Sequence, residues 1–157
     1  MDLKKLITCF TFLLFLDFCT GQTVNLTHGI DESAGRGLAY IITTPTAIYY
    51  LEKEGGGLSS MIDKDGIDWI GFHNEVGSAH KGEYRGFPNA IHKQDGNYFH
   101  PMNAGADPSK SKVDIDSEQQ VRITLTSNNK KWEGQWDFYP ERCDFTMITI
   151  SAGLKYW

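Results

Sequence analysis

The sequence predicts an all-β protein, an antiparallel β-sandwich. Apolar and polar residues alternate along several short segments that are rich in Ile, Val, Thr and aromatic residues, as in strands with one buried face. Turn sequences that contain Gly, Pro, Asn and Asp separate these segments. The chain contains no amphipathic helical segment of useful length, and half-buried antiparallel strands of this kind stack into two layers.

The first half of the chain contains four expected strands. They cover residues 38–43, 46–52, 58–62 and 67–72. Pro45 separates the first two, and the three glycines at 55–57 separate the second from the third. The turn before the fourth strand ends in Asp65 and Gly66, which suit a pair of residues with positive φ in a hairpin.

The strand pattern fades over residues 71–112 and then returns. Val121, Ile123 and Leu125 share one face of the next expected strand, and a turn follows at 127–130. A second alternating set places large side chains on one face: Trp132, Gly134, Trp136 and Phe138. A turn at 140–142 leads to a last expected strand over 145–151.

The N-terminal residues 1–21 have the pattern of a signal peptide. Lys4 and Lys5 precede an apolar run over 6–16 that is too short to span a bilayer, and Gly21 ends a stretch of small residues suited to cleavage. We therefore expect a secreted or periplasmic protein whose single β-sandwich domain covers residues 22–157.

The charge and the cysteine content of the chain argue against several classes of function. The 157-residue chain has a formal net charge of −5 and no basic stripe, which argues against nucleic acid as a partner. No apolar stretch after the signal peptide is long enough for a membrane helix. Of the three cysteines, only Cys143 follows the expected cleavage point, so an intramolecular disulfide is excluded in the mature chain. We expect this thiol to be structural or incidental, and we expect no cofactor.

The irregular region 73–107 concentrates the side chains that could carry chemistry. Acids, bases and bidentate donors stand where an ordinary solvated loop carries Ser, Lys and Glu. The expected catalytic residues are Glu83, Tyr84, His92 and His100. The expected substrate-binding residues are Arg85, Asn89, Tyr98, His80 and Asp107.

Each of these features also has a structural interpretation. A Glu83–Arg85 pair could simply order a long loop. The histidines match no compact zinc spacing, so we predict no metal site, although a site assembled across loops stays open. Residues 63–68 contain spaced acids, but Gly66 comes too early for a calcium loop, and a hairpin is the better interpretation.

Aromatic side chains could provide a surface on which a sugar ring stacks. Trp69, Trp132 and Trp136 lie in expected strands, and the last two alternate with polar residues, which favours a place in the core. The aromatic residues of the irregular region are better candidates for stacking: Tyr84, Tyr98 and Phe99.

Residues 49–70, which read YYLEKEGGGLSSMIDKDGIDWI, resemble the opening hairpin of galactose-mutarotase-like β-supersandwich proteins. Residues 84–89 and 99–101 resemble a group of secreted bacterial proteins of that architecture found beside polysaccharide-degrading enzymes. The resemblance covers residues 38–157 and implies a carbohydrate ligand without carrying over a catalytic residue. Such domains are longer than this chain, which ends on aromatic residues directly after a strand, so we expect the first part of a supersandwich.

These observations support three hypotheses. In the first, the protein is a polysaccharide or oligosaccharide hydrolase or lyase in which Arg85 holds the substrate. A lyase would use a Tyr or His base against a uronate, and a hydrolase would use two carboxylates roughly 5 to 10 Å apart, such as Glu83 and Asp107. In the second, the same region binds carbohydrate without turnover. In the third, it is part of a structural surface domain.

Overall fold

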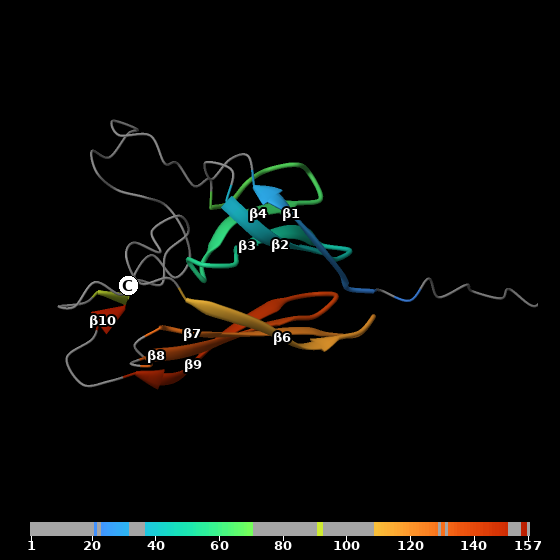
Figure 1. Cartoon of the computed structure of the whole chain (residues 1–157). Coiled ribbons are helices and arrows are strands. Elements are labelled where there is room, and N and C mark those ends of the chain that lie inside the picture. Colours follow the sequence, from blue (N-terminus) through green and yellow to red (C-terminus); the bar gives the residue numbers. More distant parts are fainter. Residues whose placement is uncertain are drawn as a thin grey trace, which may run out of the picture.

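The chain forms two four-stranded antiparallel sheets that lie one above the other (Figure 1). This all-β architecture confirms the fold class expected from the sequence. The computed structural model describes residues 21, 23–31, 37–70, 91–92, 109–128, 130, 132–150 and 155–156. The expected signal peptide, apart from Gly21, lies outside these residues and stays a prediction.

The first sheet contains the N-terminal strands in sequence order, β1-β2-β3-β4. Its strands are β1 (Asn25–Asp31), β2 (Gly37–Thr43), β3 (Ala47–Glu52) and β4 (Leu58–Asp63). A register shift between Tyr50 and Leu51 interrupts the pairing of β3 with β4. Such bulges bend a strand, and here the bend lies next to the turn that contains the three glycines.

The second sheet has the order β6-β7-β8-β9. Its strands are β6 (Lys110–Asp116), β7 (Val121–Thr126), β8 (Trp132–Phe138) and β9 (Cys143–Ile150). A further short pair joins β5 (Ile91–His92) to β10 (Lys155–Tyr156), with Lys155 opposite His92. All pairings within the two four-stranded sheets are antiparallel and join strands that follow one another in the sequence.

Most of the expected strands are confirmed, and four strands were missed, the short β5 and β10 among them. The sequence analysis did not predict β1 or β6, although Leu26 and Ile30 alternate with polar residues in the first and Val113 and Ile115 do so in the second. The strand expected at 67–72 is wrong over residues 67–70. This segment makes only one isolated bridge, between Ile62 and Asp68.

The turn that follows β4 explains this difference. The carboxylate of Asp63 accepts hydrogen bonds from the backbone N–H groups of Asp65 and Ile67, both at 2.9 Å. These N–H groups are therefore not available to a strand ladder. Gly66 has the expected positive φ of 81°, but Asp65 does not, so only half of the expected positive-φ pair is present.

The core lies between the two sheets and follows the predicted alternation. From the second sheet, the inward side chains are fully buried: Val121, Ile123, Leu125, Trp132, Trp136 and Phe138. The first sheet contributes Tyr40, Ile42, Tyr49, Leu51 and Leu58. The expectation that Trp132 and Trp136 belong to the core is thereby confirmed.

Polar contacts as well as apolar packing join the layers. The indole N–H of Trp136 donates to the backbone carbonyl of Gly56 at 3.1 Å, so a residue of β8 closes the turn between β3 and β4. The N–H of Ser109 donates to the carbonyl of Glu54 in the same turn at 2.9 Å. The glycine-containing turn is therefore fixed against the second sheet.

We expect truncation of Trp136 to destabilise the fold strongly. Trp136→Ala should lower the free energy of unfolding by about 3–5 kcal/mol, because a fully buried aromatic side chain is replaced by a cavity. Trp136→Phe should cost about 1–3 kcal/mol, because the Gly56 carbonyl loses its donor while an aromatic ring remains. Urea denaturation followed by circular dichroism measures both values.

Ile148→Ala provides the matched control. Ile148 is also a large apolar residue of the second sheet, but it is 46% exposed. Its truncation should change the free energy of unfolding by less than about 1 kcal/mol. Equal losses in the Trp136 and Ile148 variants would contradict the assignment of Trp136 to the inter-sheet core.

Candidate functional site

The residues expected to form the site lie almost entirely outside the described residues. This holds for Glu83, Tyr84, Arg85, His80, Asn89, Tyr98, His100 and Asp107. His92 is the exception, because its backbone pairs with Lys155 in the short sheet of β5 and β10. The expected convergence of these side chains in one cleft therefore stays a prediction.

Within the described residues, the hairpin tip after β4 presents the most exposed large apolar side chain. Trp69 is 66% exposed, whereas Trp132 and Trp136 are 1% and 0% exposed. Its neighbour Ile67 is also largely exposed, at 56%. A single exposed aromatic residue needs no explanation by itself, so the way in which Trp69 is held matters more than its exposure.

Two hydrogen bonds and the packing of the next residue hold Trp69 in place. Its indole N–H donates to Asp63 Oδ2 at 2.8 Å, and its backbone N–H donates to the carbonyl of Met61 at 2.9 Å. The next residue, Ile70, packs against the core together with Met61. The indole ring is consequently attached at its polar edge and at its backbone, while much of its surface remains open to solvent.

Two carboxylates of the hairpin, those of Asp63 and Asp68, accept hydrogen bonds that stabilise the loop. The backbone N–H of Ile67, followed by the indole N–H of Trp69, lowers the pKa of Asp63 below its ordinary value. Asp68 Oδ1 accepts the backbone N–H groups of Met61 and Ile70, at 3.1 and 3.0 Å. These contacts support the hairpin interpretation of the spaced acids over the calcium interpretation.

This arrangement can bind one face of a ring. An indole has a negative π face, which attracts the C–H groups on the apolar side of a sugar. Because the ring is already oriented, little side-chain freedom is lost on binding. The sequence pattern showed Asp63, Gly66 and Trp69 separately, but the hydrogen bond that joins the first and the last becomes visible only in the folded hairpin.

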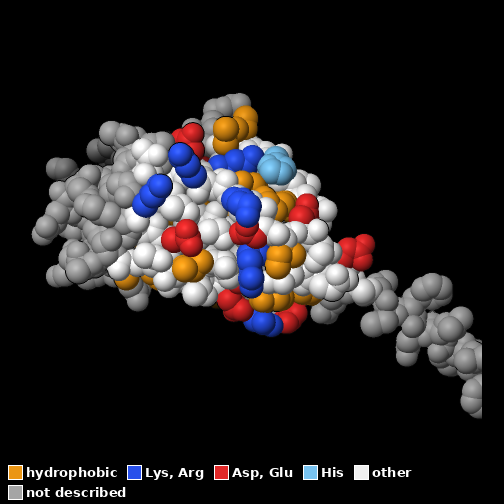
Figure 2. All heavy atoms as spheres, turned by 60° about the horizontal axis from the view of Figure 1, so that its bottom comes forward, with side chains coloured by type: hydrophobic (Ala, Val, Ile, Leu, Met, Phe, Trp, Pro, Cys, Tyr) orange, Lys and Arg blue, Asp and Glu red, His pale blue; other side chains and the backbone are white. Residues whose placement is uncertain are grey.

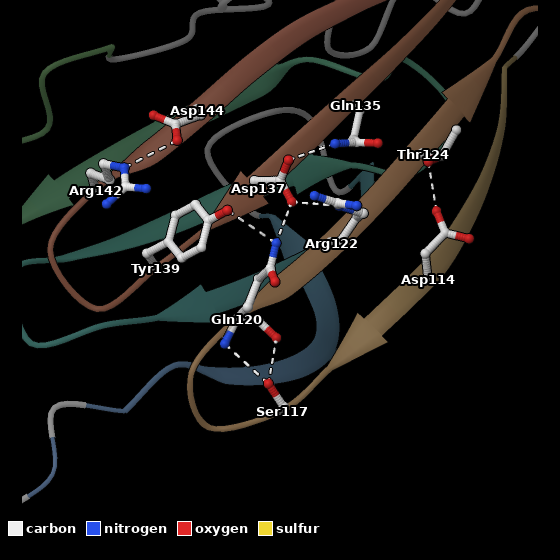
Figure 3. A network of polar contacts seen from close by, with 10 residues as sticks. All are labelled: Asp114, Ser117, Gln120, Arg122, Thr124, Gln135, Asp137, Tyr139, Arg142 and Asp144. Atoms are coloured by element: carbon white, nitrogen blue, oxygen red, sulfur yellow. Dashed lines mark hydrogen bonds and ion pairs between the residues drawn. The ribbon is translucent and has the colours of Figure 1, made fainter.

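A second polar region covers the outer face of the sheet β6–β9 (Figure 3). Asp137 lies at its centre and is bound by three side chains: Arg122 Nε at 2.7 Å, Gln120 Nε2 at 2.7 Å and Gln135 Nε2 at 2.6 Å. Burial alone raises the pKa of Asp137, but the hydrogen bonds from these donors outweigh it and hold the pKa below its ordinary value.

The remaining charges of this face are also compensated. Asp144 lies directly opposite Asp137 across β8 and β9, an unfavourable pairing of like charges. Arg142 compensates the charge of Asp144 with an ion pair at 3.1 Å. Its guanidinium group also lies over the ring of Tyr139, 4.1 Å from the ring centroid. Figure 2 shows charged side chains of both signs interspersed on this side of the molecule. We interpret this face as a solvated sheet surface whose polar groups satisfy one another.

Two acidic side chains are buried at the end of the first sheet. Asp31 and Glu52 are each only 3% exposed. The hydroxyl of Ser59 donates a short hydrogen bond to Asp31 Oδ2, and Glu52 Oε1 has no hydrogen-bond partner. Burial, followed by the charge of Asp31, raises the pKa of Glu52 to about 8. Glu52 therefore carries a proton at neutral pH, but its burial keeps it from a substrate.

Cys143 is not an activated nucleophile. Burial, followed by the neighbouring Asp144, raises the pKa of its thiol to about 11. Burial and Cys143 together raise the pKa of Tyr49 to about 12. Both groups are neutral at physiological pH, which agrees with the structural or incidental role expected for this cysteine.

Comparisons of the chain with models of protein families, with curated proteins and with solved structures found no match. The resemblance to β-supersandwich proteins therefore stays a prediction. No group of three or more metal-ligating side chains occurs among the described residues. In the same part of the chain, no helix has the length and apolar character needed to cross a membrane.

We expect the free energy of unfolding to fall with rising pH because of Glu52. In the unfolded chain this carboxyl titrates near its ordinary pKa of 4.5, and in the folded chain near 8. Between these values the unfolded state binds fewer protons, so stability present below about pH 4.5 is lost up to about pH 8. Glu52→Gln cannot ionise and should be more stable than the wild type by about 1–3 kcal/mol at pH 9.

Denaturant titrations at pH 5, 7 and 9 check this expectation. Glu118→Gln is the control, because Glu118 is an exposed acid whose charge is not among the causes of the shift at Glu52. The gain of Glu52→Gln over the wild type should grow with pH, and Glu118→Gln should show no such growth. A gain that is independent of pH would show that Glu52 is already ionised in the folded protein.

Proposed function

We propose that this chain belongs to a secreted protein that binds carbohydrate, with the ring of Trp69 as the surface on which a sugar ring lies. The single observation that carries the proposal is the hydrogen bond of 2.8 Å from the indole N–H of Trp69 to Asp63 Oδ2. It fixes the orientation of a ring that is 66% exposed. Secretion is supported by the charged and apolar pattern of residues 1–21.

Binding is the part of this function that the geometry supports best. Trp69 directly precedes the region 73–107, in which the sequence places most of its candidate sugar ligands, including Arg85 and Asn89. A stacking ring supplies affinity for the apolar face of a sugar, and hydrogen-bonding side chains supply orientation. The hydrolase and lyase hypotheses depend on residues outside the described part of the chain, such as Glu83 and Tyr84.

Replacement of Trp69 should abolish most of the binding without loss of fold. We expect Trp69→Ala to weaken binding to a recognised polysaccharide by tenfold or more, equivalent to about 1.4 kcal/mol or more. The loss should exceed that of Trp69→Phe, which keeps an aromatic face. Affinity electrophoresis on a polysaccharide panel, followed by calorimetry on oligosaccharides of the polymer that is retained, measures the effect.

Ile67→Ala provides the matched control, because Ile67 is an exposed apolar residue of the same hairpin. Its affinity should stay within about threefold of the wild type, and all three variants should unfold at the wild-type denaturant concentration. An unchanged affinity of Trp69→Ala for the polysaccharide would contradict the proposed role of the ring. Turnover of a bound polysaccharide, measured as released reducing ends or unsaturated products, distinguishes the enzyme hypotheses from binding alone.

A further inference from the structure

We propose that the outer edge of β1 (Asn25–Asp31) binds an extended peptide strand in which an acidic side chain stands between two apolar ones. This inference is independent of the proposed carbohydrate binding, because Trp69 is attached to β4, at the other edge of the first sheet. Three observations carry it: an edge that no other strand or loop pairs with, an exposed apolar row beside it, and a cation without a carboxylate partner.

The backbone of β1 is unpaired on its outer side. Residues 25–30 form backbone hydrogen bonds only with β2 among the described residues, and these six residues are exposed or half-buried. The open edge ends at Asp31, whose carboxylate accepts a hydrogen bond from Ser59 of β4. A strand edge of this kind presents N–H and C=O groups with which a peptide strand can pair.

The other edge strands of the two large sheets have features that discourage such pairing. The edge of β4 is covered, because the backbone N–H of Trp69 donates to the carbonyl of Met61. Lys and Asp side chains alternate with other residues along β6, and register shifts interrupt the pairing of β6 with β7 and of β8 with β9. In contrast, β1 contains no Lys, Arg or Pro and pairs with β2 in continuous register.

An exposed apolar row lies beside this edge. Ile30 is opposite Leu38 of β2, and the backbone N–H of Lys53 donates to the carbonyl of Leu38 at 2.9 Å. The row continues the inner face of the sheet, on which Tyr40 and Ile42 are buried in the core. Ile30 and Leu38 are nevertheless 42% and 58% exposed. An apolar side chain of an added strand would cover Ile30.

The cation beside this row has only neutral partners. Lys53 Nζ lies 2.8 Å from Nδ1 of His28 and 4.8 Å from the centroid of the Tyr40 ring. An ammonium group can only donate, so Nδ1 of His28 accepts and the imidazole is neutral, with its proton on Nε2. Among the described residues no carboxylate lies within ion-pair distance of Lys53, not even its neighbour in sequence, Glu54.

The two buried acids of this sheet do not change that balance. Asp31 follows Ile30 in β1, and Glu52 precedes Lys53. Because successive side chains of a strand point to opposite faces, these acids belong to the face away from Lys53. The inner face therefore presents a positive charge at β1 that a carboxylate from a partner could balance.

These features define the side chains of the partner. The inner face of β1 carries Leu26, His28 and Ile30 in alternation. A strand that pairs with β1 places three alternate side chains beside them. Apolar side chains suit the two outer places, and Asp or Glu suits the middle one, next to His28 and Lys53. A second copy of this chain fits less well, since it would bring two Lys53 ammonium groups together.

A short synthetic peptide tests the inference. The probe is the heptapeptide Thr-Val-Thr-Glu-Thr-Val-Thr, whose Val, Glu and Val side chains share one face. Its affinity for the full chain is measured by calorimetry at about 20 mM salt, where surface charges are weakly screened. The peptide with Gln in place of Glu should bind about three- to tenfold more weakly, and the peptide with Lys more weakly still.

Backbone methylation tests whether the peptide pairs as a strand. The N–H groups of alternate residues point to the same edge of an extended peptide. One probe carries N-methyl groups on its inner Thr residues, and a second carries them on its Val and Glu residues. One of the two should lose at least tenfold in affinity and the other much less. Equal affinities of both methylated probes and the parent peptide would overturn strand pairing.

Substitutions in the protein link the preference to the cation and the apolar row. Lys53→Gln should abolish the difference between the Glu and Gln peptides, and Lys53→Glu should reverse the preference in favour of the Lys peptide. Leu38→Thr should weaken the binding of the Glu and Gln peptides equally. Lys64→Gln is the control, because Lys64 is an exposed lysine of the hairpin after β4 and should leave all affinities unchanged.

Each contrary result has a definite meaning, provided that circular dichroism shows a folded protein. Absence of saturable binding of the Glu peptide up to about 1 mM would overturn the inference. An unchanged preference in Lys53→Glu would overturn the role of the cation. Dimerisation of the chain in sedimentation experiments that competes with the peptide would assign the edge to a second copy instead. None of these results bears on sugar binding by Trp69.

Discussion

Trp136 connects the two halves of the fold, because its side chain lies between the sheets and donates to a carbonyl 80 residues earlier in the sequence. Its ring stacks on Phe138, with ring centroids 5.9 Å apart, and tilts against Phe145 at 4.7 Å. From the first sheet, Tyr49 contacts Phe138 at 5.2 Å. A single aromatic cluster thus fixes both the separation of the layers and the turn that links β3 to β4.

This cluster also explains how far the fold could be predicted. The alternation of apolar and polar residues identifies β7 and β8 in the sequence, because every second side chain of these strands, including Trp136, faces the core. The method fails where the apolar face is sparse, as in β1, whose residues are mostly exposed along an edge. It also fails after β4, where Asp63 diverts backbone donors from the ladder although Ile67 and Trp69 suggest a strand.

The candidate site was harder to predict than the fold, for a physical reason. In a sequence, an irregular region with acids and bases is the usual sign of a site, and this pattern occurs at residues 73–107, whereas Trp69 is one of three tryptophans in expected strands. Only folding separates them, since two tryptophans enter the core and the third does not. The buried pair of Asp31 and Glu52 left no signal in the sequence, because 20 residues separate two ordinary acids.

Trp69 is exposed and fixed at the same time because its supports differ in kind. The sandwich holds its backbone, through the carbonyl of Met61 and the packing of Ile70. An ionised carboxylate holds its indole, through a contact on the solvent side of the hairpin. The first support combines a backbone hydrogen bond with apolar packing and is cooperative with the whole fold, whereas the second is local and depends on charge. The position of the ring is therefore set by the core, and its orientation is set by Asp63.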